Sequence, residues 1–108
     1  MERKVKKYGL IGKNIDYSFS KDYFNKKFKK ENIINSSYEN FDLKEINDFK
    51  NLIKQKDLSG LNVTIPYKRS IIKFLDEIDE TAKKIKAVNT LVFDSKKGII
   101  GYNTDYYG

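Results

Sequence analysis

The sequence predicts an α/β fold in which a mostly parallel sheet has helices on both faces (three layers, αβα) and an antiparallel hairpin lies near the C-terminus. Two observations predict this fold. Segments with the apolar pattern of strands alternate along the chain with segments whose apolar residues have helical spacing. Near the end, apolar residues 90–93 and 99–102 flank Ser-Lys-Lys-Gly, a turn-like sequence that favours a β-hairpin.

The first part of the chain is expected to alternate strand, helix and strand. Residues 8–12 are a short apolar run that contains two glycines, which is typical of a buried strand. A loop over residues 13–17 leads to a helix over about 20–32, with aromatic residues on one side and lysines on the other. Residues 36–41 then predict a more polar strand.

A second helix is expected to begin at Asp42. Glu45 follows three residues later, which is the spacing of a capping box, with Asp in place of the usual Ser or Thr. Apolar residues at helical spacing would form the buried side of this helix, namely Ile46, Phe49, Leu52 and Ile53.

The single proline of the chain marks the end of the third strand. In residues 62–65, apolar and polar side chains alternate, as they do in a strand with two different faces. Pro66 has no N–H for a strand ladder, and its φ angle is close to that of a helix. It is therefore expected to end the strand and to open a helix over 67–75. A short helix around 80–86 precedes the hairpin.

Composition narrows the chemistry that is open to this chain. Its 108 residues suit one domain, and they include neither cysteine nor histidine. Disulfides, zinc–thiolate sites and a cysteine nucleophile are therefore excluded, and so is the usual histidine base. Acid–base chemistry must use Lys, Asp, Glu or Tyr, and we expect no metal site. The sequence shows no signal peptide or membrane span, which predicts a cytoplasmic location and no membrane partner.

The net charge of +7 does not by itself indicate a nucleic-acid partner. Only two of the 22 basic residues are arginine, which is the residue preferred for reading guanine. The lysines are spread along the chain among 15 acidic residues, and a solvated helix face explains the cluster at 26–30. We therefore expect no nucleic-acid partner and a modest preference for small anions.

Two strand ends deliver polar residues that suit a ligand site. Lys68 follows the third predicted strand, and residues 103–105 follow the predicted hairpin. In open α/β sheets, ligands bind beyond the carboxyl ends of the strands. Because the chain stops three residues after Asp105, we expect it to be one domain of a longer protein.

Four polar motifs occur in the order and spacing of one enzyme family. They are Ser-Phe-Ser at 18–20, Asn-Val-Thr-Ile-Pro-Tyr-Lys at 62–68, Ala-Val-Asn-Thr at 87–90 and Gly-Tyr-Asn-Thr-Asp at 101–105. With these motifs the chain resembles the amino-terminal, substrate-binding domain of shikimate dehydrogenases over residues 1–108. The family reduces 3-dehydroshikimate to shikimate with NADPH in chorismate and aromatic amino-acid biosynthesis.

The resemblance implies that the cofactor NADP is held by a second domain, a Rossmann fold that is absent from this chain. None of the six glycines forms a Gly-x-Gly-x-x-Gly motif. We therefore expect no residue here to bind the cofactor. The isolated chain is expected to bind shikimate, the small-molecule partner, only weakly and to reduce nothing.

The resemblance also implies roles for seven residues. Lys68 matches the family's catalytic lysine, and Asp105 matches its partner. A positioned lysine can deliver a proton to the alkoxide that forms when a ketone is reduced. The residues that match the family's substrate-binding positions are Ser18, Ser20, Asn62, Thr64 and Asn89.

Simpler roles remain open for some of these residues. Lys68 could be an ordinary solvated lysine, one of the two serines could be a helix N-cap, and Asn89 could be a turn residue. The chain also departs from the family's pattern at two positions, where Lys21 replaces the usual proline and Tyr106 replaces glycine.

Two alternative functions follow from the same residues. A quinate or aminoshikimate dehydrogenase would use the same half-site with a different specificity. A stand-alone module would bind a small hydroxylated acid without catalysing any reaction.

Overall fold

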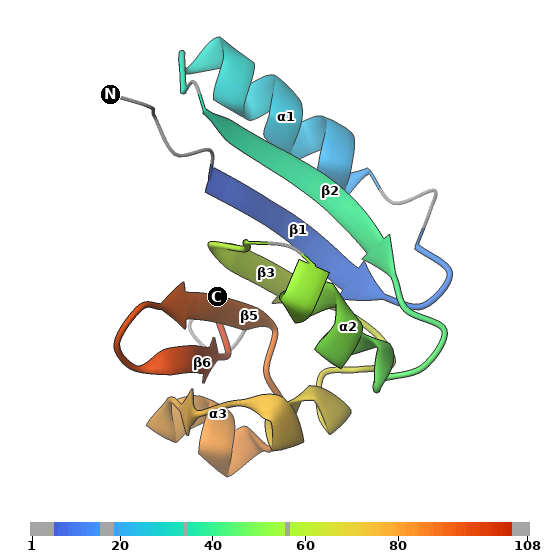
Figure 1. The fold of residues 1–108 in the computed structure, drawn as a ribbon, viewed down its shortest axis with the longest axis vertical. Helices are drawn as coiled ribbons and strands as arrows, with labels where there is room; N and C mark the ends of the chain where they lie inside the picture. The colour runs from blue at the N-terminus through green and yellow to red at the C-terminus, as the bar shows by residue number, and fades with distance from the viewer. Residues whose placement is uncertain (1–5, 16–18, 34, 56, 105–108) are drawn as a thin grey trace.

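The computed structural model describes residues 6–15, 19–33, 35–55 and 57–104. Its strands are β1 (Lys6–Gly12), β2 (Ser36–Asp42), β3 (Gly60–Val63), β4 (Glu77–Ile78), β5 (Thr90–Asp94) and β6 (Gly98–Tyr102). Its helical segments are α1 (Ser20–Lys30), α2 (Asp48–Gln55), the 3-10 helix η1 (Ser70–Phe74) and α3 (Glu80–Ile85). The strands form one six-stranded sheet in the order β2-β1-β3-β5-β6-β4 (Figure 1).

Parallel pairs predominate in this sheet, as predicted. The β1 strand pairs in parallel with β2 and β3, and β4 pairs in parallel with β6. The β5 strand is antiparallel to both of its neighbours, β3 and β6. The carboxyl ends of β1, β3 and β6 therefore lie at the same edge of the sheet as the beginning of β5.

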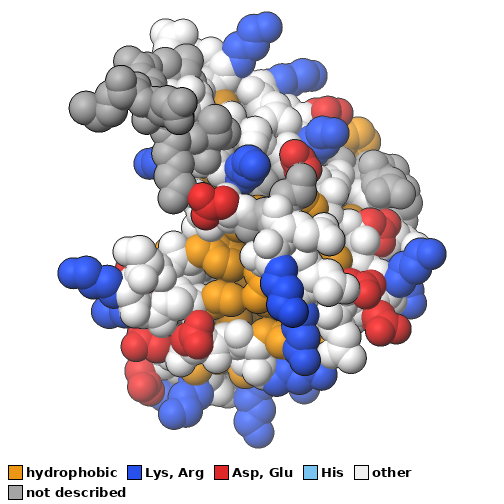
Figure 2. Space-filling view, in the orientation of Figure 1, with side chains coloured by type: hydrophobic (Ala, Val, Ile, Leu, Met, Phe, Trp, Pro, Cys, Tyr) orange, Lys and Arg blue, Asp and Glu red, His pale blue; other side chains and the backbone are white. Residues whose placement is uncertain are grey.

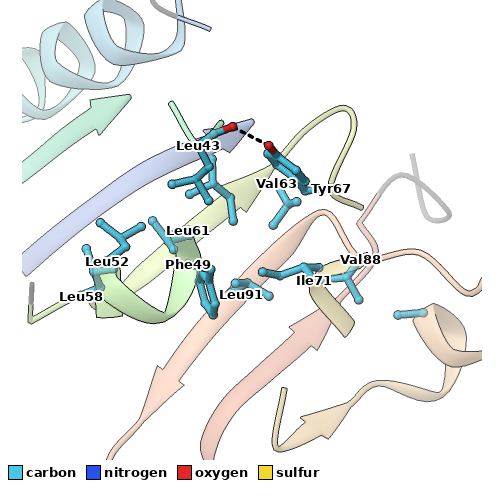
Figure 3. Packing of buried hydrophobic residues seen from close by; sticks show 12 residues of the cluster. Leu43, Phe49, Leu52, Leu58, Leu61, Val63, Tyr67, Ile71, Val88 and Leu91 are labelled. Atoms are coloured by element: carbon cyan, nitrogen blue, oxygen red, sulfur yellow. Dashed lines mark hydrogen bonds between the residues drawn. The ribbon is translucent and has the colours of Figure 1, made fainter. Parts of the chain in front are cut away.

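One face of the sheet carries the main core. Residues of β1, β3 and β5 pack there against α2, η1 and α3 in a single buried cluster, part of which is shown in Figure 3. Its largest fully buried side chains are Phe49, Ile11, Ile71, Leu91 and Val88. Burial of this apolar area is the main term that stabilises the fold.

The opposite face is covered in part by α1. Leu10, Ile15 and Tyr38 are buried there, with the Phe24 and Phe28 side chains of α1 packed against them. In Figure 1, α1 lies along β1 and β2 and does not extend over β5. The sheet thus has helices on both faces, which confirms the predicted three-layer α/β architecture.

The expectation that a helix begins at Asp42 is wrong. Asp42 is the last residue of β2, and α2 begins at Asp48. The two carboxylate oxygens of Asp42 instead accept hydrogen bonds from the backbone N–H groups of Asn14 (3.0 Å) and Ile15 (3.1 Å). Asp42 therefore holds the loop that follows β1, and the capping-box spacing with Glu45 is not used.

The segment after Pro66 also differs from the prediction. The β3 strand ends at Val63, Ile65 is 76% exposed, and the Ile65–Pro66 peptide bond is cis. In place of a helix over 67–75, the chain forms only the short 3-10 helix η1. Tyr67 is buried, and its hydroxyl donates a hydrogen bond to the carbonyl oxygen of Leu43 (Figure 3).

The last third of the chain is close to the prediction. The α3 helix begins as expected, with the Asp79 carboxylate accepting from the N–H of Thr81 at 3.1 Å. The hairpin of β5 and β6 turns at residues 95–97, and Gly98 follows with a φ angle of 85°, which suits glycine. The two-residue strand β4 is the one strand of the described sheet that the sequence did not predict.

Candidate functional site

Three segments that carry predicted site residues meet at the edge where β1, β3 and β6 end. The carbonyl oxygen of Lys68 accepts from the N–H of Val88 at 2.8 Å. The carbonyl oxygen of Asn89 accepts from the N–H of Val63 at 2.8 Å, and the N–H of Asn89 donates to the carbonyl of Tyr102 at 3.0 Å. Segments 62–68, 87–90 and 101–104 are therefore joined directly through their backbones.

Lys68 lies in the turn between Pro66 and η1. Lys68 is half-buried, so part of its surface is shielded from solvent. The residue before it, Tyr67, is anchored in the core by its hydrogen bond to Leu43. This anchor fixes the backbone from which the Lys68 side chain starts. Asp105, the expected partner of Lys68, lies outside the described residues.

Asn89 is buried, and its side chain makes a local hydrogen-bond network. Oδ1 accepts from the backbone N–H of Thr104 (3.0 Å), from the Thr104 hydroxyl (3.3 Å) and from the Thr90 hydroxyl (2.9 Å). Nδ2 donates to Oγ1 of Thr104 at 3.0 Å. Asn89 therefore ties the start of β5 to the segment that follows β6, which is a structural task beyond that of a simple turn residue.

Asn62 occupies the third position of β3 and is half-buried. Its Oδ1 accepts a hydrogen bond from the Tyr38 hydroxyl at 2.9 Å. On the other side, Asn62 is the register partner of Thr90 on β5. Tyr38 was not predicted as a site residue, because it belongs to no recognisable sequence motif. Its contact with Asn62 also reaches from β2 across β1 to β3, which the sequence does not reveal.

Thr64 follows β3, and its N–H donates to the carbonyl of Ile11 at 2.9 Å. Its side chain lies against the backbone of Gly12, where a Cβ atom would come within 2.5 Å of the Thr64 methyl carbon and 2.9 Å of Ile15 Cγ2. Only glycine fits this position without a shift of Thr64. The end of β1 and the start of the Thr64 segment are therefore closely packed.

Ser20 is the first residue of α1, which begins on the side of the sheet where β1 ends (Figure 1). The N-cap of this helix is Phe19, which makes no side-chain cap, so Ser20 is not the N-cap that was considered as an alternative. Lys21 is exposed. Ser18 and Tyr106 lie outside the described residues.

A cavity of about 550 Å³ lies on the α1 face of the sheet. Of the predicted site residues that the structure describes, only Asn62 lines it. Its walls are mainly apolar and aromatic, with Tyr8, Phe24, Leu61 and Val92 among them. Such walls do not suit a hydroxylated acid, so we place the candidate site at the sheet edge, with Asn62 between the edge and the cavity.

Other kinds of site find no support in the described part of the chain. No three carboxylates there lie close enough together to hold a metal ion. None of the helices in residues 6–104 that the structure describes is long and apolar enough to cross a bilayer. Figure 2 shows lysine and arginine side chains scattered around the visible face, with hydrophobic side chains near its centre. A continuous basic surface is not present on that face.

Tyr38 should make the stability of the fold sensitive to alkaline pH. Burial raises the pKa of its hydroxyl from 10.0 to about 12. An unfolded chain releases this proton near pH 10, whereas the folded chain keeps it, so the contribution to stability is complete below pH 10 and is lost between pH 10 and about 12. We expect the free energy of unfolding, measured with denaturant across this window, to fall less steeply in Tyr38→Phe.

Burial and, to a smaller extent, Asp48 also raise the pKa of Tyr67. Tyr67 contributes equally to the pH dependence of the free energy of unfolding in the wild type and in Tyr38→Phe. The difference between the slopes of these two proteins therefore measures the contribution of Tyr38. Equal slopes in the wild type and in Tyr38→Phe would contradict the expectation.

Comparison with protein families gives one match that covers most of the chain. Residues 10–91 match the family described as "Shikimate dehydrogenase substrate binding domain". A curated relative, the shikimate dehydrogenase (NADP(+)) of Clostridium botulinum strain Hall, is 48% identical over 102 residues. The alignment covers 93% of this chain and 39% of that protein, so the chain spans well under half the length of this relative.

Solved structures show the same fold. Shikimate dehydrogenase 1 from Peptoclostridium difficile has a TM-score of 0.84 and 38% identity, covering 94% of this chain and 38% of that one. Shikimate 5-dehydrogenase from Listeria monocytogenes, in complex with shikimate and NAD, has a TM-score of 0.81 and 31% identity. That match covers 97% of this chain and 37% of the other.

Proposed function

The chain belongs to the family of shikimate dehydrogenase substrate-binding domains, and we propose that it is the substrate-binding half of an enzyme that reduces 3-dehydroshikimate to shikimate with NADPH. The observation that carries this proposal is the meeting of three motif-bearing segments at one sheet edge. Segments 62–68, 87–90 and 101–104 are far apart in the sequence, yet backbone hydrogen bonds join them. This edge is where α/β sheets bind their ligands.

Lys68 supplies the proton in the proposed reaction. Reduction of a ketone places negative charge on the carbonyl oxygen, which then takes up a proton. The Lys68 ammonium group donates an N–H to this oxygen, stabilises the charge that develops there and transfers the proton as the hydroxyl forms. Its half-buried position favours such a role, because partial exclusion of water strengthens the interaction. Asp105 is the proposed partner of Lys68.

The remaining predicted residues bind the polar groups of the substrate. The hydroxyls of Ser18, Ser20 and Thr64 and the amide of Asn62 supply hydrogen bonds for the carboxylate and hydroxyl groups. Asn89 has a more limited role in binding. Its Oδ1 already accepts three hydrogen bonds, so it is left with the second proton of Nδ2 for the substrate.

The residues of this chain do not fit a nucleotide-binding site. The sequence contains no Gly-x-Gly-x-x-Gly motif. The β1 strand ends at Gly12, and α1 starts only at Ser20. A dinucleotide fingerprint would instead connect strand and helix by a tight glycine turn. We therefore assign no residue of this chain to NADP and propose that a separate domain holds it.

An assay of the natural full-length protein tests the proposal. We expect NADP⁺ to be reduced when shikimate is added, with a lower kcat/KM for quinate. Faster turnover of quinate would favour the alternative specificity. Binding of shikimate without any reduction of NADP⁺ or NAD⁺ would favour a non-catalytic module. Absence of both binding and turnover would overturn the proposal.

A further inference from the structure

Tyr38 and Asn62 are joined by a hydrogen bond that spans three strands. The Tyr38 hydroxyl donates to Oδ1 of Asn62 at 2.9 Å. Tyr38 lies on β2 beside Tyr8 of β1, and Asn62 lies on β3 beside Leu10 of β1. The tyrosine side chain therefore reaches diagonally across the middle strand to the amide group.

The tyrosine ring is held by both the sheet and α1. It is 3% exposed and stacks on Phe24, with the ring centroids 4.5 Å apart. The Asn25 side chain binds both backbone groups of Tyr38, since Nδ2 donates to the carbonyl at 3.0 Å and Oδ1 accepts from the N–H at 3.1 Å. These contacts restrict the position of the Tyr38 ring and of its hydroxyl oxygen. The Asn62 amide, which is bonded to this hydroxyl, is held by the same contacts.

In the structure, this bond places Oδ1 of the Asn62 amide toward the Tyr38 hydroxyl. Rotation of an asparagine amide by half a turn exchanges one acceptor for two donors. With Oδ1 held by the Tyr38 hydroxyl, Nδ2 and its two protons point away from that hydroxyl. Asn62 is half-buried and lies one residue before the end of β3, so its amide can be reached from the sheet edge where the candidate site lies. The Tyr38 hydroxyl is protonated at physiological pH, since burial raises its pKa further above the ordinary value of 10.0.

We propose that Tyr38 is a positioning residue, which fixes the Asn62 amide so that Nδ2 donates a hydrogen bond to a hydroxyl oxygen of a hydroxylated carboxylic acid. This proposal rests on the proposed function, because it takes Asn62 as a substrate-binding residue. Tyr38 acts only through Asn62 and touches no substrate. Its effect should therefore disappear when the Asn62 amide is absent.

A double-mutant cycle in the natural full-length protein tests this dependence. The dissociation constant for shikimate is measured by calorimetry in the wild type, Tyr38→Phe, Asn62→Ala and the double variant. We expect Tyr38→Phe to weaken binding by about 2- to 12-fold, the range for one neutral hydrogen bond. In the Asn62→Ala background, the same change should have almost no effect. An equal loss in both backgrounds would overturn the role of Tyr38.

A second measurement requires no substrate. The mobility of the Asn62 side-chain amide is measured by NMR in ligand-free protein labelled with ¹⁵N at asparagine. We expect the Nδ2 group to be rigid in the wild type and more mobile in Tyr38→Phe. Tyr8→Phe is the matched control, since Tyr8 lines the same cavity as Asn62, and it should leave this mobility unchanged. An equally rigid amide in Tyr38→Phe, with normal shikimate binding, would overturn the positioning role alone. Failure of the wild type to bind shikimate would overturn the proposed function, and the substrate role of Asn62 with it.

Discussion

Replacing Lys68 with alanine should lower the kcat for shikimate oxidation by about 10²- to 10⁴-fold, which is the usual rate enhancement from a positioned acid–base group. Lys68 is the half-buried lysine at the edge where three motif-bearing segments meet, and it is assigned both proton transfer and charge stabilisation. Turnover is measured as NADPH formation in the natural full-length protein. NADPH binding, followed by fluorescence, should be almost unchanged, because no residue of this chain is assigned to the cofactor.

Two further variants separate the possible contributions of Lys68. Lys68→Arg keeps the positive charge but holds its proton far more tightly, so its kcat should remain well below that of the wild type. Lys73→Ala is the matched control, because Lys73 is an exposed lysine of η1 whose Nζ lies 5.3 Å from the centre of the Phe74 ring. Near wild-type turnover in Lys68→Ala, or an equal loss in Lys73→Ala, would contradict the assignment.

The parts of the fold that the sequence predicts well are those determined by local signals. The α3 helix is preceded by its N-cap residue Asp79, whose carboxylate accepts a hydrogen bond from the N–H of Thr81, two residues away. The hairpin turn depends on Asp94, which accepts from the N–H groups of Lys96 and Lys97, and on the positive φ angle of Gly98. Each of these interactions lies within a few residues, so a pattern in the sequence is enough to predict it.

The errors arise where a distant contact overrides the local pattern. Asp42 has the spacing of a capping residue, but its carboxylate binds backbone N–H groups of the loop at residues 14 and 15. Residues 67–75 are predicted to form a helix, but the Tyr67 hydroxyl donates a hydrogen bond to the Leu43 carbonyl in the core. The β4 strand has two residues, which is too short to show any period.

The candidate site was predictable in its location and less so in its details. The rule that ligands bind at strand ends brings Lys68 and residues 103–104 to one edge, and the sheet topology agrees with this. The hydrogen bonds of the individual side chains were not predictable. Neither the reach of Tyr38 to Asn62 nor the network of Asn89 follows from any motif, because both depend on strand order and register.

Asn89→Ala should lower the free energy of unfolding by about 1–3 kcal/mol, since the network formed by its amide includes several hydrogen bonds. The same variant should lower turnover. Thr104, which Asn89 holds in place, directly precedes the proposed catalytic residue Asp105 in the sequence. Stability is measured by denaturant unfolding, and turnover by shikimate oxidation in the natural full-length protein.

Asn89→Asp is the matched variant, because it keeps an oxygen where Oδ1 accepts from Thr104 and Thr90 but loses the Nδ2 donor. We expect it to retain most of the stability that Asn89→Ala loses. If turnover falls in both variants, the Nδ2 group is needed for substrate binding. If it falls only in Asn89→Ala, the role of Asn89 is to hold the segment after β6. A free energy of unfolding within about 0.5 kcal/mol of wild type in Asn89→Ala would show that the network contributes little, contrary to what its burial and its bonds predict.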